Sequence, residues 1–296
     1  MVGESGCGKS MMAFTIMGLL PENMTASGEV LFGSNLLRLP EKELCQIRGN
    51  RMGMVFQEPM TALNPVLPIG FQVAESLRLH KSLSLHEAQN QASKVLDRVG
   101  LPAKNFSRSL YPHQLSGGQR QRVVIAIAIV CEPELIIADE PTTALDVTIQ
   151  EEILALISEL VLERNMALIL ITHDLGVVAE NTDQMLVMYA GRIVERGPTQ
   201  KVFRHLAHPY TRGLFASIPD SEKSLNEPSQ QLEYSRKKRL STIPGRVPEF
   251  WERSKGCSFA DRCSRTQGKC SSLVPDEIQF DTGHYTTCFF PYEQNE

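Results

Sequence analysis

Residues 3–10 read GESGCGKS, and this stretch decides the fold because it completes the phosphate-loop pattern G-x-x-x-x-G-K-S. Two further stretches accompany it: LSGGQ at residues 115–119, which opens a long apolar run, and LIIADE at residues 135–140. A phosphate loop alone indicates only that a chain binds a nucleotide. The three stretches in this order indicate an enzyme that hydrolyses ATP.

The residue types of the phosphate loop suit a bound triphosphate. Its glycines allow backbone N–H groups to approach the phosphates, and the helix that follows presents its positive N-terminal end to them. Lys9 is expected to supply a charge for the β and γ phosphates, and the hydroxyl of Ser10 can ligate Mg²⁺. The predicted nucleotide-binding residues of the loop are Gly3, Ser5, Gly6, Gly8, Lys9 and Ser10.

The apolar run at residues 135–138 is typical of a strand that is buried on both faces of a parallel sheet. Such a strand delivers Asp139 and Glu140 at its carboxyl end, where α/β sheets place their ligands. We expect Asp139 to hold the metal, directly or through water. We expect Glu140 to polarise the attacking water, which makes it the predicted catalytic carboxylate.

With these motifs the chain resembles the ATP-binding subunits of ABC transporters, and specifically the bacterial dipeptide/oligopeptide (peptide/nickel) importer group. The resemblance covers essentially the whole chain after the first residue. It implies an α/β fold, a P-loop NTPase of the ABC ATPase type with a helical subdomain and a C-terminal cysteine-rich extension. It also implies an ATPase that uses ATP and Mg²⁺ to power peptide import across the bacterial inner membrane.

The resemblance assigns further site residues. Ser116, Gly117 and Gly118 match the motif that lies at a helix N-terminus and binds the γ-phosphate held by a partner subunit. This arrangement implies that two subunits close each nucleotide site.

Three other polar residues match family positions. Gln57 follows the strand-like residues 52–56 and resembles the glutamine that binds the metal and signals to the membrane subunit. His173 follows the strand-like residues 167–172 and resembles the histidine that contacts the γ-phosphate, while Asp146 resembles the loop that couples the two sites. Taken singly, Gln57 reads as a solvated loop residue and His173 as a structural histidine. Their joint position after apolar strands, in family order, favours the functional interpretation.

The domain organisation follows from the same comparison. Residues 1–220 are the predicted nucleotide-binding domain, with a helical subdomain at about 58–119. Residues 221–239 form a polar linker, and residues 240–296 form the oligopeptide-transporter-type extension.

Capping boxes at residues 84–87 and 148–151 predict two helix starts, the second helix running to about Glu163. Its apolar stripe is predicted to face the core; the stripe consists of Ile149, Ile153, Leu156, Ile157 and Leu160. Within the helical subdomain, Met60, Leu63 and Phe71 could belong to the core or face a partner.

Four of the seven cysteines lie in the C-terminal extension: Cys257, Cys263, Cys270 and Cys288. Structural disulfides are rare in cytosolic proteins, and four thiolates on a short segment suit a metal centre. The intervals of five, six and seventeen residues contain none of the close pairs typical of zinc ribbons. The resemblance implies that these cysteines ligate a [4Fe–4S] cluster; zinc and unmetallated thiols stay open as alternatives. Cys45 and Cys131 are predicted to be packing residues.

Composition agrees with this class. The 296 residues are 42% hydrophobic and carry a net charge of −4, which implies no general attraction to nucleic acid. No stretch approaches the roughly 20 apolar residues that cross a bilayer, and no secretory signal precedes the phosphate loop. We therefore expect a peripheral protein on the cytoplasmic side of the inner membrane, held there by protein partners.

The resemblance names those partners: a related second ATPase subunit that forms a heterodimer, two transmembrane permease subunits and an extracytoplasmic substrate-binding protein. Dipeptide, oligopeptide, nickel and glutathione all remain open as cargo. Two other functions stay as alternatives, a soluble ABC ATPase acting on nucleic acid and an inactive truncated remnant. The second arises because the phosphate loop normally follows a strand, whereas only Met1 and Val2 precede it here. The resemblance places in that upstream segment an aromatic residue on which adenine stacks.

Overall fold

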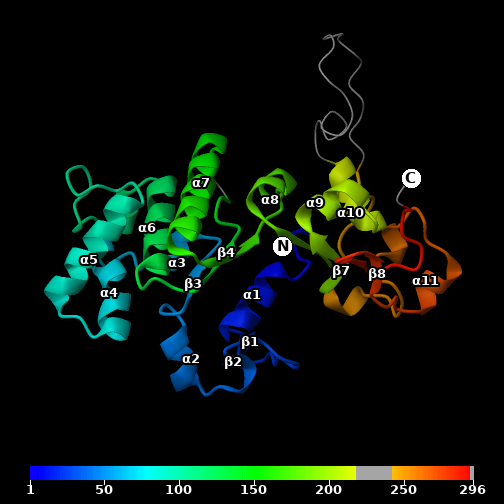
Figure 1. The fold of residues 1–296 in the computed structure, drawn as a ribbon, viewed down its shortest axis with the longest axis horizontal. Helices are drawn as coiled ribbons and strands as arrows, with labels where there is room; N and C mark the ends of the chain where they lie inside the picture. Colours follow the sequence, from blue (N-terminus) through cyan, green and yellow to red (C-terminus); the bar gives the residue numbers. More distant parts are fainter. Residues whose placement is uncertain (144, 218–241, 294–296) are drawn as a thin grey trace, which may run out of the picture. The chain divides into compact units, whose positions relative to one another are not determined.

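The computed structural model describes residues 1–143, 145–217 and 242–293, and Figure 1 shows its ribbon. The chain divides into two compact units, one formed by Ser10–Thr172 and the other combining Met1–Lys9 with His173–Glu296. The predicted polar linker at 221–239 lies outside the described residues. Within the described part of the chain, no helix has both the length and the apolar character needed to cross a membrane.

A parallel sheet forms the centre of the unit Ser10–Thr172. Its strand order is β3 (Met52–Val55), β4 (Leu135–Asp139) and β5 (Ala167–Ile171). Every residue of β3 and β4 is buried, as expected of strands covered on both faces. The three strands predicted from apolar runs are confirmed, and each ends within one residue of its predicted end.

Helices pack against this sheet and against one another. The helices α4 (Ile69–Lys81), α5 (Leu85–Arg98) and α6 (Gly117–Ile129) contact each other and lie side by side in Figure 1. The predicted start of α5 is confirmed, because Ser84 Oγ accepts a hydrogen bond from the backbone N–H of Glu87 at 3.3 Å. The other elements of this unit are α1 (Lys9–Met17), β1 (Leu31–Phe32), β2 (Ser34–Asn35), α2 (Glu41–Ile47), α3 (Pro59–Ala62), α7 (Val147–Arg164) and the 3₁₀ turns η1 (Leu36–Arg38) and η2 (Pro112–Gln114).

The capping box predicted at residues 148–151 is wrong. Helix α7 begins at Val147 with Asp146 as its N-cap, so Thr148 lies inside the first turn. The backbone leaves the helical conformation at Asp146, and aspartate favours an N-cap position more strongly than threonine does. The apolar stripe of α7 nevertheless faces the core, with Ile153, Leu156, Ile157 and Leu160 buried.

The three apolar residues for which the sequence left a core position and a partner-facing position open have different environments. Leu63 is buried, whereas Phe71 is half-buried and Met60 is exposed. Leu63 is therefore a core residue, and only Met60 is fully available to a partner.

The second unit contains a four-stranded antiparallel sheet. Its order is β6 (Gln184–Tyr189), β7 (Arg192–Pro198), β9 (His284–Thr286) and β8 (Ile278–Asp281). The strands β8 and β9 come from the cysteine-rich extension. Val2 forms a parallel bridge to Val187 of β6, so the residue before the phosphate loop is hydrogen-bonded to this sheet.

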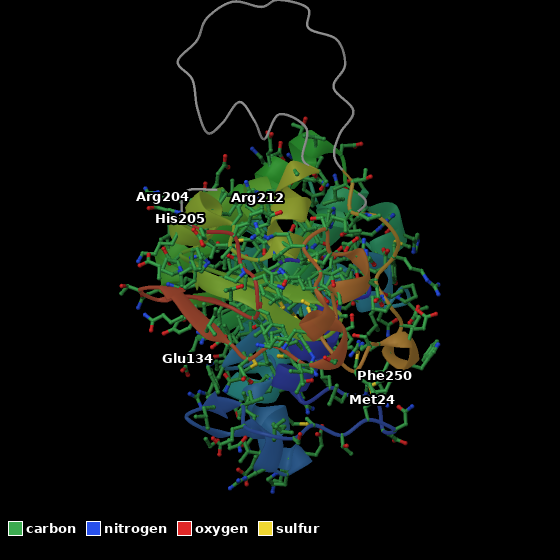
Figure 2. All side chains as sticks on the ribbon, turned by 90° about the vertical axis from the view of Figure 1, so that its right-hand side faces the viewer. Met24, Glu134, Arg204, His205, Arg212 and Phe250 are labelled. Carbon is green, nitrogen blue, oxygen red and sulfur yellow. The ribbon has the colours of Figure 1, made fainter. Side chains whose placement is uncertain are left out.

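An aromatic cluster occupies the core of this second unit. The rings of Tyr189, Tyr210 and Phe259 have centroids 4.6–5.3 Å apart. Helix α9 (Thr199–His205) ends with two basic residues, Arg204 and His205, which are labelled in Figure 2. Positive side chains stabilise a helix at this end, because the C-terminus of a helix carries a partial negative charge. The remaining helices here are α8 (Leu175–Asn181), α10 (Pro209–Ala216), α11 (Gly268–Ser272), and the short 3₁₀ turns η3 (Phe250–Glu252) and η4 (Ala260–Arg262).

Candidate functional site

The phosphate loop has the backbone conformation that its glycines allow. Gly3, Gly6 and Gly8 have φ angles of 153°, 80° and 100°, which favour glycine. A Cβ atom at Gly3 would lie only 2.3 Å from the carbonyl oxygen of Met188, whereas a Cβ at Gly6 would meet open space. Gly3 is thus required by close packing on β6, and Gly6 leaves room beside the loop for a ligand.

The lysine of the loop lies within the loop itself. Lys9 is only 5% exposed, and its Nζ donates hydrogen bonds to the carbonyl oxygens of Gly3 at 2.9 Å and Glu4 at 3.2 Å. The loop therefore surrounds a cation and leaves space at Gly6. These features fit a bound polyphosphate.

A carboxylate and an amide meet at the carboxyl end of the parallel sheet. Glu140 follows β4 directly, and its Oε2 accepts hydrogen bonds from Gln57 Nε2 at 3.1 Å and from Thr143 Oγ1 at 3.0 Å. Its backbone N–H donates to the carbonyl oxygen of Ile171 at 2.9 Å. The structure therefore brings together two of the predicted site residues, Gln57 and Glu140, from different strand ends.

The backbone of Glu140 is strained. Its φ angle is +45°, a left-handed conformation that costs a non-glycine residue about 1–3 kcal/mol. The hydrogen bonds to Ile171 and Thr143 hold it there. Strain of this kind is concentrated at functional positions, where it fixes the direction of a side chain.

The predicted magnesium ligands belong to the unit Ser10–Thr172. Asp139 is the last residue of β4 and is 2% exposed. Ser10, Asp139 and Gln57 together offer a hydroxyl, a carboxylate and an amide oxygen, and Mg²⁺ prefers oxygen ligands. Because Gln57 uses its amide nitrogen toward Glu140, its oxygen is the atom it would offer to a cation. The donor set fits the metal.

The LSGGQ stretch starts α6, as predicted. Ser116 is the N-cap: its Oγ accepts a hydrogen bond from the backbone N–H of Gln119 at 3.3 Å, and its own N–H donates to Gln119 Oε1 at 2.9 Å. A Cβ at Gly118 would lie 2.8 Å from a methyl group of Ile149, so this glycine permits the close approach of α7. Ser116 itself is exposed and leaves the helix N-terminus open to a partner.

His173 follows a strand, as the sequence predicts, whereas Asp146 caps a helix that was predicted to begin at Thr148. His173 is exposed and follows β5 by two residues, and Asp146 is exposed at the N-terminus of α7. The roles assigned to these two residues remain predictions.

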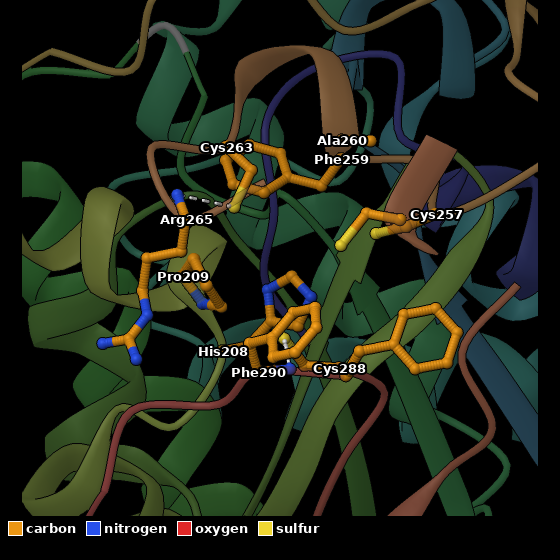
Figure 3. A pocket seen from close by; sticks show the side chains of 11 residues that line it. His208, Pro209, Cys257, Phe259, Ala260, Cys263, Arg265, Cys288 and Phe290 are labelled. Atoms are coloured by element: carbon orange, nitrogen blue, oxygen red, sulfur yellow. Dashed lines mark hydrogen bonds between the residues drawn. The ribbon is translucent and has the colours of Figure 1, made fainter. Parts of the chain in front are cut away.

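The four cysteines of the extension line one small cavity, shown in Figure 3. Its volume of about 10 Å³ corresponds to the space of a single water molecule. Among the residues that the structure describes, no group of three or more His, Cys, Asp or Glu side chains is arranged to hold a metal ion. The cavity lining includes Cys257, Cys263, Cys270 and Cys288.

The environment of Cys257, Cys263 and Cys288 favours the neutral form of their thiols. Burial raises the pKa of Cys257 and Cys263, and it raises the pKa of Cys288 to about 12. The sulfur atoms of Cys263 and Cys288 each accept a backbone N–H hydrogen bond at 3.4 Å, drawn as dashed lines in Figure 3. In number and kind these donors suit a cluster or a zinc ion, but the cavity would have to widen to hold either.

Some residues of this region were not found by sequence reasoning. His208 is buried and lines the cysteine cavity, and Arg262 of the extension forms two hydrogen bonds with Glu4 of the phosphate loop. No sequence signal pairs residues so far apart in the chain. The prediction that Cys45 is a packing residue is wrong, because it is exposed on α2 and donates to Glu41 at 3.3 Å; Cys131 is buried as predicted.

Comparison with protein families gives two matches. Residues 1–143 match the model described as ABC transporter, and residues 194–270 match the model described as oligopeptide/dipeptide transporter, C-terminal region. The second match includes three of the four cavity cysteines.

Individual proteins agree with both family matches. The oligopeptide transport ATP-binding protein OppD of Salmonella typhimurium is 46% identical over 99% of this chain and 84% of its own length. OppD of Haemophilus influenzae is 45% identical over 99% of this chain and 87% of its own length. Among solved structures, the dimeric ABC transporter cassette MJ0796 aligns with a TM-score of 0.59 at 32% identity, covering 67% of this chain and 83% of that one. The same cassette with ADP and Pi bound, in a post-hydrolysis state, aligns with a TM-score of 0.59 at 31% identity and the same coverage.

Proposed function

This chain belongs to the ABC transporter family, as an ATP-binding subunit of the oligopeptide/dipeptide group, and we propose how its residues perform the ATP hydrolysis that drives peptide import. The observation that carries the proposal is the Glu140 carboxylate, held by Gln57 at the end of a buried strand directly after Asp139. A carboxylate in this position is suited to act on water.

Binding of the nucleotide is assigned to the phosphate loop. The backbone N–H groups of the loop bind the phosphates, and Lys9 exchanges its two carbonyl partners for the β and γ phosphate oxygens. Ser10, Asp139 and Gln57 would hold Mg²⁺, and the bound ion would supply positive charge that neutralises the phosphates. These assignments give Glu140 no role as a metal ligand.

Hydrolysis is assigned to Glu140. Its carboxylate accepts a hydrogen bond from the attacking water and orients it toward the γ-phosphorus. Gln57 and Thr143 fix the carboxylate in place through their hydrogen bonds to Oε2. His173, at the end of the neighbouring strand, contacts the γ-phosphate.

The remaining assignments concern the partner subunits. Ser116, Gly117 and Gly118 bind the γ-phosphate of a second, related ATPase subunit, and that heterodimer docks on two transmembrane permeases at the cytoplasmic face of the inner membrane. An extracytoplasmic binding protein delivers the peptide. The exposed N-terminus of α6 and the dimeric form of the similar cassette MJ0796 support this arrangement.

The proposed function is tested by what stimulates ATP turnover. The assay uses liposomes that contain this subunit, the second ATPase and the permeases. A peptide-loaded binding protein should raise the rate of ATP hydrolysis several-fold, which corresponds to lowering the activation barrier by roughly 1 kcal/mol. The same protein should not respond to DNA or RNA. Stimulation by nucleic acid without any response to peptide would reject transport in favour of a nucleic-acid ATPase.

We further propose that the cavity cysteines ligate a [4Fe–4S] cluster, with zinc as the alternative. The support is that four cysteines from distant positions converge on one cavity. The chemistry of ATP hydrolysis needs no redox centre, so the group would be structural or regulatory.

The cluster proposal predicts brown protein after anaerobic purification, with stoichiometric iron and acid-labile sulfide. Cys263→Ser should reduce the iron content at least severalfold because four thiolates complete the ligation of a cluster. Cys45→Ser is the matched control, because Cys45 is exposed on α2 and outside the cavity, and it should leave the iron content unchanged. Stoichiometric zinc without iron or sulfide would reject the cluster proposal and identify the cysteines as a zinc site.

A further inference from the structure

An ion pair joins the C-terminal extension to the phosphate loop. Arg262 donates through Nη1 to Glu4 Oε2 at 2.8 Å and through Nη2 to Glu4 Oε1 at 3.0 Å. Both residues belong to the same compact unit. Two parallel bonds from a guanidinium to a carboxylate form the strongest and most directional ion pair available to side chains.

The arginine side of this pair is fixed in place. The Arg262 side chain is only 7% exposed and that of Glu4 is 29% exposed. Arg262 Nε also donates to the carbonyl oxygen of Pro244 at 2.7 Å, and Nη1 donates to the hydroxyl of Tyr189 at 3.3 Å. The guanidinium is therefore held by the extension and by β6 as well as by the loop.

The glutamate side lies inside the nucleotide-binding loop. The backbone N–H of Glu4 donates to the hydroxyl of Tyr210 at 2.8 Å, and its carbonyl oxygen accepts a hydrogen bond from Lys9 Nζ at 3.2 Å. One residue thus connects Arg262, through its side chain, with the lysine of the phosphate loop, through its main chain.

The charge of Glu4 matters because the loop binds an anion. An uncompensated carboxylate in the loop would repel the triphosphate, and its effect would be strong in a partly buried site where solvent screening is weak. Arg262 neutralises this carboxylate and holds it by two bonds. The pair therefore acts on nucleotide affinity both through charge and through the position of the loop.

The same arginine is next to the cysteine cavity. Arg262 precedes Cys263, and Phe259, which also lines the cavity in Figure 3, packs its ring on Tyr189 and Tyr210 at 5.0 and 5.3 Å. A rearrangement of the loop between Cys257 and Cys263 would consequently move Arg262, which binds the Glu4 side chain, and Phe259, which packs on Tyr210, the residue that binds the Glu4 backbone.

We propose that Arg262 is a positioning residue for the ATPase site: it holds and neutralises Glu4, so that the C-terminal extension sets the affinity of the phosphate loop for nucleotide. This inference rests on the assignment of residues 3–10 as the nucleotide site. Arg262 itself does not touch the reacting atoms.

The test is the dissociation constant of MgATP for the full chain, measured by titration calorimetry. Arg262→Gln should raise this constant about tenfold, the effect of one uncompensated charge near an anion site. The double variant Glu4→Gln/Arg262→Gln removes both charges and should recover most of the affinity. Arg246→Gln is the matched control, since Arg246 is an exposed arginine of the same extension, paired with Glu252 at 2.7 Å, and it should bind as the unaltered chain does.

Two results would overturn the inference: Arg262→Gln binding MgATP as tightly as the Arg246→Gln control, or the double variant binding no better than Arg262→Gln alone. Recovery in the double variant shows that the loss of affinity in Arg262→Gln comes from the uncompensated carboxylate of Glu4. A third variant, Lys9→Ala, tests separately whether the phosphate loop at residues 3–10 binds the nucleotide. Loss of binding in Lys9→Ala with normal binding in Arg262→Gln rejects only the role of Arg262, whereas full binding in Lys9→Ala rejects the phosphate-loop assignment itself.

Discussion

Replacing Glu140 by glutamine should lower the rate of ATP hydrolysis roughly a thousandfold, the typical contribution of a positioned general base. The substitution keeps the length and shape of the side chain, so the strained backbone and the contacts at the end of β4 can persist. It removes the negative charge that polarises the attacking water. The phosphate loop is unaltered, and the affinity for MgATP should therefore stay within about twofold of normal, well under the tenfold that 1.4 kcal/mol would give.

The matched control for this variant is Glu134→Gln at the other end of the same strand. Glu134 directly precedes β4, pairs with Arg51 at 2.6 Å on the surface, and is labelled in Figure 2. Loss of an exposed pair costs at most about 1 kcal/mol of stability and should not change turnover. Steady-state hydrolysis and MgATP binding, measured on both variants, separate catalysis from folding. Normal turnover in Glu140→Gln would contradict the assignment of Glu140 as the catalytic carboxylate.

The second large effect is expected at Ser116. Ser116→Arg fills the exposed N-terminus of α6, which we propose binds the γ-phosphate of the partner subunit. The rate of hydrolysis by the assembled pair should fall about 100-fold, the typical effect of removing one hydrogen-bond donor that stabilises the transition state. MgATP binding to the separate chain should not change, because its own phosphate loop is untouched.

Ser84→Arg controls for the loss of a helix cap. Ser84 is also an exposed N-cap serine, and it makes the same capping box with Glu87 at the start of α5. Each substitution forfeits a cap worth about 1 kcal/mol, so the two variants should lose similar stability. Equal turnover in the two variants, or full-rate hydrolysis by strictly monomeric protein at high dilution, would contradict a site shared between subunits.

The sequence predicts well those features that depend on local patterns. Continuous apolar runs identify β3, β4 and β5, because a strand buried on both faces needs apolar residues throughout. Since these strands are parallel, their ends share one edge of the sheet, which is why Gln57 and Glu140 could be expected near each other. The start of α5 follows equally from the capping pattern at residues 84–87, which is contained within four residues, whereas the helix start at Ser116 was implied by the family resemblance.

Features that depend on distant contacts or on competing local signals could not be predicted. Asp146 and Thr148 both favour an N-cap, and only the course of the chain after β4 decides between them. The pairing of β9 with β7 and of Arg262 with Glu4 joins segments far apart in sequence, for which a single chain contains no pattern. The exposure of Cys45 shows the same limit, since burial is decided by neighbours in space.

Whether ATP hydrolysis at Glu140 powers import is tested by the uptake of a radiolabelled peptide into sealed vesicles that contain the permeases and both ATPase subunits. The binding protein and the peptide are added outside, and the phosphate-loop domains face a lumen loaded with MgATP. Peptide is expected to accumulate inside only when MgATP is present, and the accumulation should disappear when this subunit carries Glu140→Gln, while Glu134→Gln transports normally. Accumulation that proceeds equally without ATP, or equally with Glu140→Gln in place, would show that ATP hydrolysis at Glu140 does not power import.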